Sequence, residues 1–206
     1  IYFKGELDLA GNLTGLITGA NAKAGDTIKF FGVPFSQYAK VTADFRHYLK
    51  LNEKSQLASR FIAGAGFSYG NATEMPATKQ YVIGGPNSIR AFRSQTLGPG
   101  SYIPPADATF LADETGDIKF EFNTEYRAKL FSIVEGALFV DAGNIWLLNE
   151  DPEQPNAEFT KDFMKEIAVG VGAGLRLDFT FLIFRTDLAF PIRQPYPVNG
   201  DNWVID

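Results

Sequence analysis

Apolar and polar residues alternate along most of the chain, and this period of two predicts β-strands rather than helices. The segment 118–126 shows the pattern best, with Ile118 and Phe120 on one face and Lys119 and Glu121 on the other. Seven segments carry the same alternation: 2–13, 35–49, 57–69, 118–126, 134–146, 166–178 and 182–190. The chain is therefore predicted to be an all-β protein.

The predicted strands fit a transmembrane antiparallel β-barrel better than a soluble sandwich. Several of them exceed the usual soluble strand length of about 5–6 residues, and a tilted membrane strand needs about 9–11. Their polar faces carry charges of both signs at mid-strand, and aromatic residues recur near strand ends, as in interface belts. Tight connections alternate with long ones, which is the pattern of bacterial barrels. The longest connection, residues 70–116, is rich in Gly and Pro.

Seven strands are an unusual number, because bacterial barrels have even counts and an open edge in lipid leaves backbone groups unsatisfied. Residues 191–206 are rich in Pro and Asn and predict no further strand. We therefore expect the closing strand to be missing after residue 190 and further strands to precede residue 1. No secretion signal is visible at residues 1–12, so we expect the protein to begin upstream of Ile1.

Composition narrows the classes of function. Mean hydropathy is −0.08, which is ordinary for a barrel whose strands alternate lipid-facing and lumen-facing residues. A net charge of −5 argues against a nucleic-acid partner. Cys is absent and His47 is the only His, so we expect no catalytic site, no metal site and no cofactor.

Two segments resemble a known family. Residues 81–102 read YVIGGPNSIRAFRSQTLGPGSY and residues 139–143 read FVDAG. Both are similar to the BamA/TamA-type outer-membrane assembly and translocation family, also called the bacterial surface-antigen family. The sequence YVIGGPNSIRAF, together with LDLAGN at residues 7–12, looks most like the sequences of the TamA-like (TamL) proteins of Bacteroidetes.

The resemblance implies a barrel of sixteen strands with a long loop folded into the lumen, here about 70–116. The loop follows the family's eleventh strand, so residues 1–206 would be the C-terminal part of one barrel domain, covering strands nine to fifteen. The family's loop-tip motif corresponds to Ile89, Arg90, Ala91 and Phe92, and its strand motif to Phe139, Asp141 and Gly143. Ala91 replaces the family's Gly and puts only local backbone freedom in doubt.

Arg90 is the residue with the clearest expected role. An unpaired charge in a restricted cavity is costly, and Asp141 faces the lumen by strand parity. The resemblance implies the Arg90–Asp141 pair and adds a carboxylate that maps best to Glu125, with Glu121 as the rival on the same face. We predict that Arg90 lies within salt-bridge distance of Asp141, Glu125 or both.

Two glycine-rich segments are interpreted structurally. Gly84-Gly85 could cradle a phosphate, but it neither opens a helix nor fits a P-loop, so turn chemistry is favoured. The run of Gly170, Gly172 and Gly174 is expected to give room to the inserted loop, or to curve the sheet, rather than to bind a ligand.

The function that the resemblance implies is non-enzymatic insertion or translocation of proteins at the bacterial outer membrane. Client strands would add at a weak seam between first and last barrel strands by edge pairing. Expected partners are outer-membrane lipid, client outer-membrane or secreted proteins, and periplasmic or inner-membrane partner proteins. The alternatives are a two-partner-type secretion pore, the barrel domain of a fused lipase, and a passive porin, against which the Arg90 loop argues.

Overall fold

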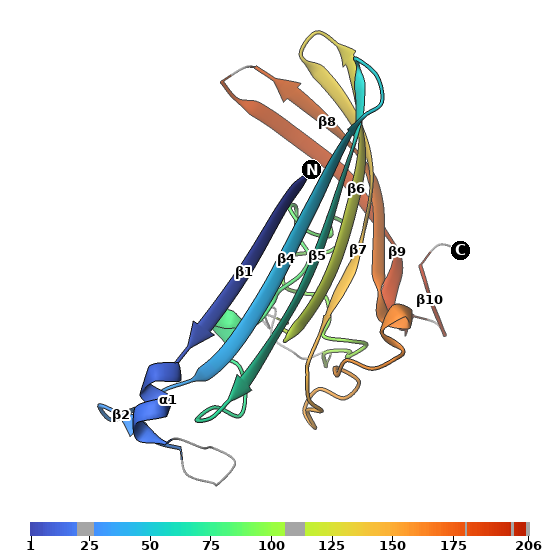
Figure 1. The fold of residues 1–206 in the computed structure, drawn as a ribbon. Helices are drawn as coiled ribbons and strands as arrows, with labels where there is room; N and C mark the ends of the chain where they lie inside the picture. Colours follow the sequence, from blue (N-terminus) through green and yellow to red (C-terminus); the bar gives the residue numbers. More distant parts are fainter. Residues whose placement is uncertain (20–26, 106–113, 180, 199, 205–206) are drawn as a thin grey trace.

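The strands form one antiparallel, eight-stranded sheet in the computed structural model, which describes residues 1–19, 27–105, 114–179, 181–198 and 200–204. The order in the sheet is β1-β4-β5-β6-β7-β8-β9-β10, so neighbours in sequence are neighbours in space (Figure 1). The strands are β1 (Tyr2–Ala10), β4 (Gln37–Lys50), β5 (Ser55–Tyr69), β6 (Ile118–Phe131), β7 (Val134–Trp146), β8 (Ala168–Asp178), β9 (Ile183–Val198) and β10 (Asp201–Trp203). Among the described residues, β1 and β10 are the edges and do not pair with each other.

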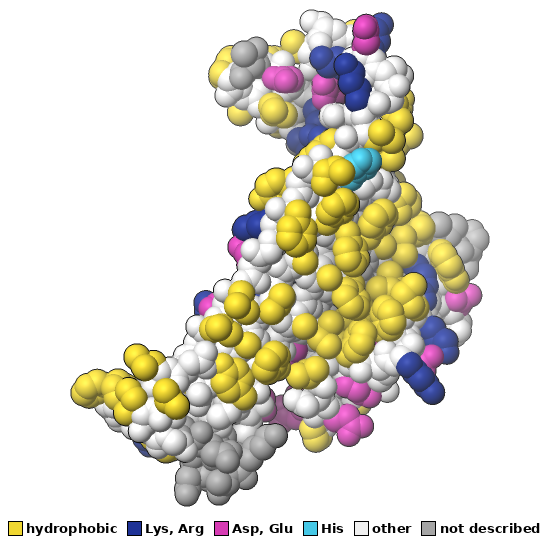
Figure 2. Space-filling view, viewed as in Figure 1, with side chains coloured by type: hydrophobic (Ala, Val, Ile, Leu, Met, Phe, Trp, Pro, Cys, Tyr) yellow, Lys and Arg dark blue, Asp and Glu magenta, His cyan; other side chains and the backbone are white. Residues whose placement is uncertain are grey.

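The register of the strands sorts the side chains onto two faces. Phe3, Phe45, Phe61 and Phe122 lie opposite one another on successive strands, and each is at least 42% exposed. We call this the outer face; Figure 2 shows an apolar surface across the middle of it, with charged side chains gathered toward its ends. The opposite, inner face carries the charges that alternate with these residues, including Glu121 and Glu125, which are buried.

The two ends of the sheet differ in their connections. Residues 51–54, 132–133 and 179–182 join strands by short turns at one end, which we call the turn end. At the other, the loop end, the connections are long (Figure 1). One of them contains helix α1 (Asn12–Thr18) and the hairpin of β2 (Lys29–Phe30) and β3 (Val33–Pro34), and the others contain the 3-10 turns η2 (Ala77–Lys79) and η3 (Phe163–Glu166).

Three expectations about the elements were wrong. The first strand ends at Ala10 rather than Leu13, because Gly11 adopts φ 70° and α1 begins at Asn12. Residues 29–30 form strand β2, although none of the predicted strands falls between residues 13 and 35; residues 20–26 lie outside the described part. Strand β9 continues past Phe190 to Val198, and β10 pairs with it as an eighth strand.

Proline does not stop β9, for a local reason. The register between β8 and β9 shifts between Val169 and Gly170, next to Pro191, and the ladder with β8 ends at Arg193. Pro195 and Pro197 therefore lie beyond the paired region, where a missing backbone N–H breaks no hydrogen bond to β8.

The described parts of the connection from β5 to β6, residues 70–105 and 114–117, fold back against the inner face of the sheet (Figure 1). An apolar cluster holds its base, formed by Tyr81, Ile83, Ile89 and Leu97 of the loop with Ile145 of β7 and Ala168 of β8. These side chains are all at most 7% exposed, and Phe92 packs against them. In the described ranges, no helix is both long and apolar enough to cross a membrane.

Candidate functional site

Strands β6 and β7 place the acceptors of the site side by side on the inner face. Asn123 lies opposite Asp141, and Glu125 lies opposite Phe139. Because inward residues on adjacent strands are direct cross-strand neighbours, these four side chains form a compact patch at mid-strand. The tip of the β5–β6 loop meets the sheet at this patch.

Arg90 at the loop tip is held by two carboxylates. Its Nε donates to Asp141 Oδ2 at 2.8 Å, and its Nη2 donates to Asp141 Oδ1 at 2.9 Å. Nη1 donates to Glu125 Oε2 at 2.6 Å, and the Arg90 backbone N–H donates to Asp141 Oδ2 at 3.1 Å. The Arg90 and Asp141 side chains are 7% and 0% exposed. This is the planar, bidentate geometry for which arginine is suited, and the contacts predicted for Arg90 are present.

The guanidinium of Arg90 also stacks on an aromatic ring. Its Cζ lies 3.3 Å from the centre of the Phe139 ring, a cation–π contact at a site screened from water. Phe139 is 3% exposed and points inward from β7, two residues before Asp141. The strand motif thus supplies both a counter-ion and a stacking surface to one side chain.

Glu125 is shared between three arginines. Besides Arg90, its Oε1 accepts from Arg127 Nε at 2.7 Å and from Arg176 Nη2 at 2.6 Å. Asp187 of β9 adds a further carboxylate, 3.7 Å from Arg90 Nη1. The network therefore connects the loop tip to β6, β7, β8 and β9.

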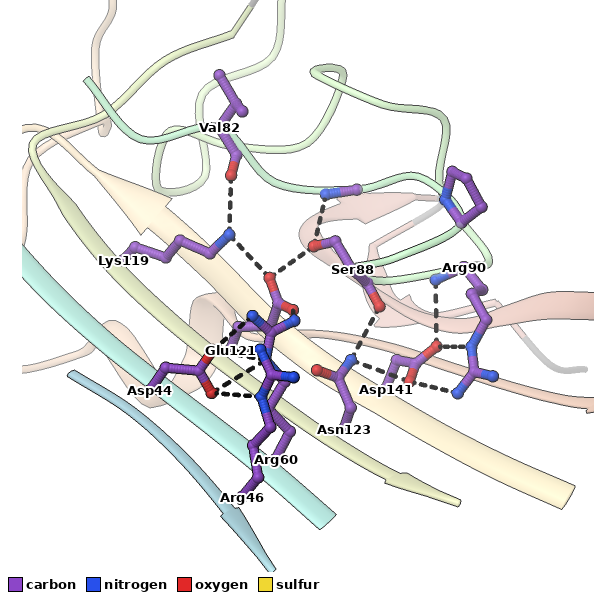
Figure 3. A network of polar contacts seen from close by, with 12 residues as sticks. Asp44, Arg46, Arg60, Val82, Ser88, Arg90, Lys119, Glu121, Asn123 and Asp141 are labelled. Carbon is purple, nitrogen blue, oxygen red and sulfur yellow. Dashed lines mark hydrogen bonds and ion pairs between the residues drawn. The ribbon is translucent and has the colours of Figure 1, made fainter. Parts of the chain in front are cut away.

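A second polar attachment of the loop to the sheet is made by Ser88, two residues before Arg90 (Figure 3). Ser88 Oγ donates to Glu121 Oε2 at 2.6 Å, and the Ser88 carbonyl accepts from Asn123 Nδ2 at 2.8 Å. Lys119 Nζ donates to the Val82 carbonyl and lies 2.8 Å from Glu121 Oε2. Glu121, the rival partner for Arg90, is thus engaged with Ser88 and Lys119, and the structure places Glu125 in that role.

The charges continue across the sheet toward β4. Asp44 accepts hydrogen bonds from both Arg46 and Arg60, each with a shortest distance of 2.8 Å (Figure 3). Arg60 Nη1 is also 3.9 Å from Glu121 Oε1. A cavity of about 380 Å³ lies between this pair and the loop tip, and its lining includes six arginines: Arg46, Arg60, Arg90, Arg127, Arg176 and Arg185.

The Gly84-Gly85 pair forms a turn, as predicted. Both residues have positive φ, and the Gly84 N–H donates to Ser88 Oγ while the Gly85 N–H donates to the Phe92 carbonyl. A Cβ at Gly84 would lie 2.4 Å from the Arg93 carbonyl oxygen, so a side chain does not fit there. The turn carries Ile89 into the apolar cluster while Arg90 reaches the carboxylates.

The glycines of β8 make room for the site. A Cβ at Gly170 would lie 2.5 Å from the Ala91 Cβ of the loop tip, and one at Gly172 would lie 2.3 Å from the Phe139 ring. A Cβ at Gly174 would lie 2.3 Å from Asp187 Oδ1. Gly143, the last residue of the strand motif, lies close to the Phe120 carbonyl and the Ile83 side chain, which leaves no space for a Cβ. The expectation of room for the inserted loop holds at Gly170.

Sequence reasoning missed several members of the network. Ser88, Asn123 and Arg176 make direct contacts to it, but nothing in their spacing marks them. Strand parity places Asn123 and Arg176 on the polar faces of their strands but does not single them out from the other polar residues there. In the part of the chain that the structure describes, no group of three or more His, Cys, Asp or Glu side chains is placed to hold a metal ion.

A family model described as the Omp85 superfamily domain matches residues 20–203. The chain belongs to the Omp85 superfamily. Among solved structures, it is similar to BamA from Haemophilus ducreyi lacking POTRA domains 1-3, with 23% sequence identity and a TM-score of 0.61. The match covers 81% of this chain but only 33% of that one, so the chain spans about a third of that structure's length.

Membership of the Omp85 superfamily confirms the predicted family and the predicted fold, a partial outer-membrane β-barrel. The outer face is then the lipid-facing wall, and the inner face with its loop is the lumen. In bacterial outer-membrane barrels the short turns lie on the periplasmic side. The short connections of the turn end and the long connections of the loop end follow this pattern.

Proposed function

We propose that the protein containing this chain inserts or translocates other polypeptides at the bacterial outer membrane, without enzymatic chemistry. Membership of the Omp85 superfamily supports assembly or transport at the level of the family. Within that range, the observation that carries the proposal is the buried attachment of Arg90 to Asp141 and Glu125. A loop fixed to the inner wall gives the barrel a braced side, against which another part of the barrel can open.

The role of each motif residue follows from its contacts. Arg90 is the attachment point, Asp141 and Glu125 are its acceptors, and Phe139 is the stacking surface. Ile89 and Phe92 bury the loop on either side of the arginine, while Ala91 and Gly143 allow close approach to the wall. The loop also occupies lumen space that in a passive porin would be an open channel for solutes. We therefore assign the loop a part in insertion or translocation.

The proposal is tested with the full-length protein reconstituted in phospholipid vesicles. Urea-denatured outer-membrane barrel proteins are added, and their folding is followed by heat-resistant migration and protease protection. We expect Arg90→Ala and Asp141→Ala to slow client folding by a similar factor, since each removes the same attachment. Lys161→Ala, an exposed position in the β7–β8 loop, is the matched control and is expected to leave the rate unchanged.

The assay also separates the alternatives. Transport of a secreted partner across the vesicle wall, without acceleration of barrel folding, would support a two-partner-type secretion pore instead. Release of fatty acids from the vesicles would support a fused lipase. Equal folding rates with wild type and Arg90→Ala would remove the loop attachment from the mechanism.

Finer assignments belong to the same proposal. We place residues 1–206 in the C-terminal part of a single barrel domain, with the inserted loop at about 70–116, and assign the protein to the TamL group. Client proteins, outer-membrane lipid and periplasmic or inner-membrane proteins are its proposed partners. The similarity of YVIGGPNSIRAF supports the subgroup, and purification of the full-length protein with its bound partners tests it.

A further inference from the structure

Helix α1 packs on the outer face of the sheet, on the same side as the lipid-facing surface. Gly15 lies against Gln37 of β4, where a Cβ would come within 2.0 Å of the Gln37 amide nitrogen. Gln37 is only 6% exposed beneath the helix, and the Tyr69 hydroxyl of β5 donates to Asn12 Oδ1. The helix is therefore attached to the barrel wall rather than to the lumen.

The opposite side of α1 is apolar and largely exposed, and Leu16 at its edge also borders a cavity toward the β5–β6 loop. Leu13, Leu16 and Ile17 are 72%, 83% and 74% exposed. At 100° per residue these positions fall within one arc, and Gly15 lies on the other side of the helix. Segment 12–18 contains no charged residue, so nothing in the helix opposes contact with an apolar phase.

The β2–β3 hairpin adds apolar surface next to the helix. Phe31 is 93% exposed at the turn, Val33 is 65% exposed, and the Phe30 and Phe31 rings pack against each other. Buried Asn71 fixes the base of the hairpin, because its side chain hydrogen-bonds the Ile28 N–H and the Ile28 and Phe35 carbonyls. These apolar side chains are thus held in place by the end of the sheet.

This surface continues the apolar middle of the outer face, which we call the lipid-facing belt. Leu9, Ala39 and Phe67 form an outward-facing row across β1, β4 and β5 at the loop end, and Leu9 and Phe67 are about half exposed. The next outward pair in the register is Gln37 and Tyr69, the two residues on which α1 docks. Figure 2 shows apolar side chains gathered over α1 and β2 on the same side as the belt.

We propose that α1 and the β2–β3 hairpin form an interfacial anchor that lies in the outer leaflet of the outer membrane, with Leu13, Leu16, Ile17 and Phe31 among the acyl chains. Short helices with one apolar side lie in the plane of the membrane interface, about 5–10 Å into the headgroup boundary. The aromatic Tyr69 beneath the helix is the residue type that marks this depth in barrels. Lipid covers the surface because it already covers the belt one row away.

The test uses spin labels in the full-length protein, reconstituted in nanodiscs of phosphatidylcholine and phosphatidylglycerol. These 206 residues contain no cysteine, so Leu16→Cys and Phe31→Cys give labels at defined positions here. Leu7→Cys on the belt and Glu153→Cys in the β7–β8 loop are the lipid-exposed and water-exposed controls. Collision with oxygen, which partitions into lipid, is compared with collision with a water-soluble nickel chelate.

We expect the ratio of oxygen to nickel collisions at positions 16 and 31 to exceed that at position 153 several-fold and to approach that at position 7. Nickel collisions as frequent as at position 153 would overturn the anchor and place the surface in water. Low collision with both reagents would also overturn it, because another protein segment would then cover the surface. Neither outcome depends on client folding, so the anchor can be disproved while the proposed function holds, and the reverse is also true.

Discussion

The tip and the base of the β5–β6 loop are held in the lumen by different interactions. At the tip, Arg90 makes directional, charge-assisted hydrogen bonds to Asp141 and Glu125. At the base, Ile83, Leu97 and their neighbours bury apolar surface against β7 and β8. Apolar contact fixes how deeply the loop sits but tolerates small displacements, whereas the bidentate pair fixes which residues meet.

The difference has an energetic consequence. Removing one member of a buried ion pair leaves the other charged and unpaired, at about 3–5 kcal/mol, whereas removing a few buried methyl groups costs about 2–5 kcal/mol according to the cavity left. Loss of a tip contact is therefore expected to release the whole attachment, and loss of a base contact is expected to loosen it in proportion to the cavity left. Three substitutions test this comparison, and a fourth prediction concerns the neighbouring β7–β8 loop.

Arg90→Ala is expected to have the largest effect. Asp141 and Glu125 would keep buried charges without their partner, at a cost of about 3–5 kcal/mol. Hydrogen exchange of the Gly85 amide, which donates to the Phe92 carbonyl, reports this opening. Arg90→Lys, which keeps the charge without the bidentate fork, is the matched control and should fall between Ala and wild type. Unchanged exchange in Arg90→Ala would show that the base alone holds the loop.

Leu97→Ala removes a side chain that is 2% exposed from the apolar cluster. The expected cost is about 2–5 kcal/mol, from lost burial and the cavity that remains. Exchange should rise at the Gln95 amide, which donates to the Ile83 carbonyl, while the Arg90 amide stays protected by Asp141. Val82→Ala, at a side chain 37% exposed, is the control. Equal exchange increases at both amides would mean that tip and base open together.

Gly170→Ala places a methyl group where the Ala91 Cβ already lies. Overpacking of this kind costs about 1–3 kcal/mol. The double variant with Ala91→Gly is expected to recover most of the loss, because it removes the opposing methyl. Denaturant unfolding of the reconstituted barrel measures both, and a double variant no better than Gly170→Ala would contradict the direct contact.

The smallest expected effect is a pH dependence outside the lumen. Partial burial raises the pKa of Glu166 in the β7–β8 loop, and its Oε2 accepts from Trp146 Nε1 at 2.6 Å. A raised carboxyl pKa means that the folded loop favours the protonated form, so its stabilising contribution is present at low pH. It is lost as pH rises through the folded pKa.

Trp146 fluorescence quenching by iodide should therefore increase slightly between acidic and neutral pH. Glu166→Gln, which keeps an acceptor for Trp146 but cannot ionise, should abolish this change. A pH response that persists in Glu166→Gln would assign it to another group of the loop.

Much of the sheet could be predicted because alternation and burial agree. The segments predicted at 35–49, 57–69 and 134–146 correspond closely to β4, β5 and β7. Helix α1 was missed because Leu13 continues the odd-numbered apolar series of Leu7 and Leu9, and only the backbone of Gly11 breaks it. The end of β9 was missed because prolines normally end strands. Here Pro191 lies at a register shift and the later prolines lie beyond the ladder with β8, and neither can be known without the pairing of the two strands.

The site was predictable in part. Strand parity predicted that Asp141 faces the lumen, and the family resemblance implied that Arg90 meets it, as the structure shows. The resemblance favoured Glu125, but the choice between Glu121 and Glu125 could not be made from strand parity, since both face the lumen on β6 and lie four residues apart, about 13 Å along the strand. It depends on how far the loop descends, which the apolar cluster and the Gly84-Gly85 turn set in three dimensions.

The attachment of Arg90 also acts on the strands themselves. Its acceptors lie on β6 and β7, with Asp187 of β9 nearby. Sliding β6 past β7 to the next equivalent register would separate Glu125 from Asp141 by about 7 Å more, beyond the reach of one guanidinium. The contacts of Arg90 thus oppose sliding of these strands past one another. Strands β6 to β9 can tilt or move as a rigid unit, and relative movement of strands must occur elsewhere in the barrel.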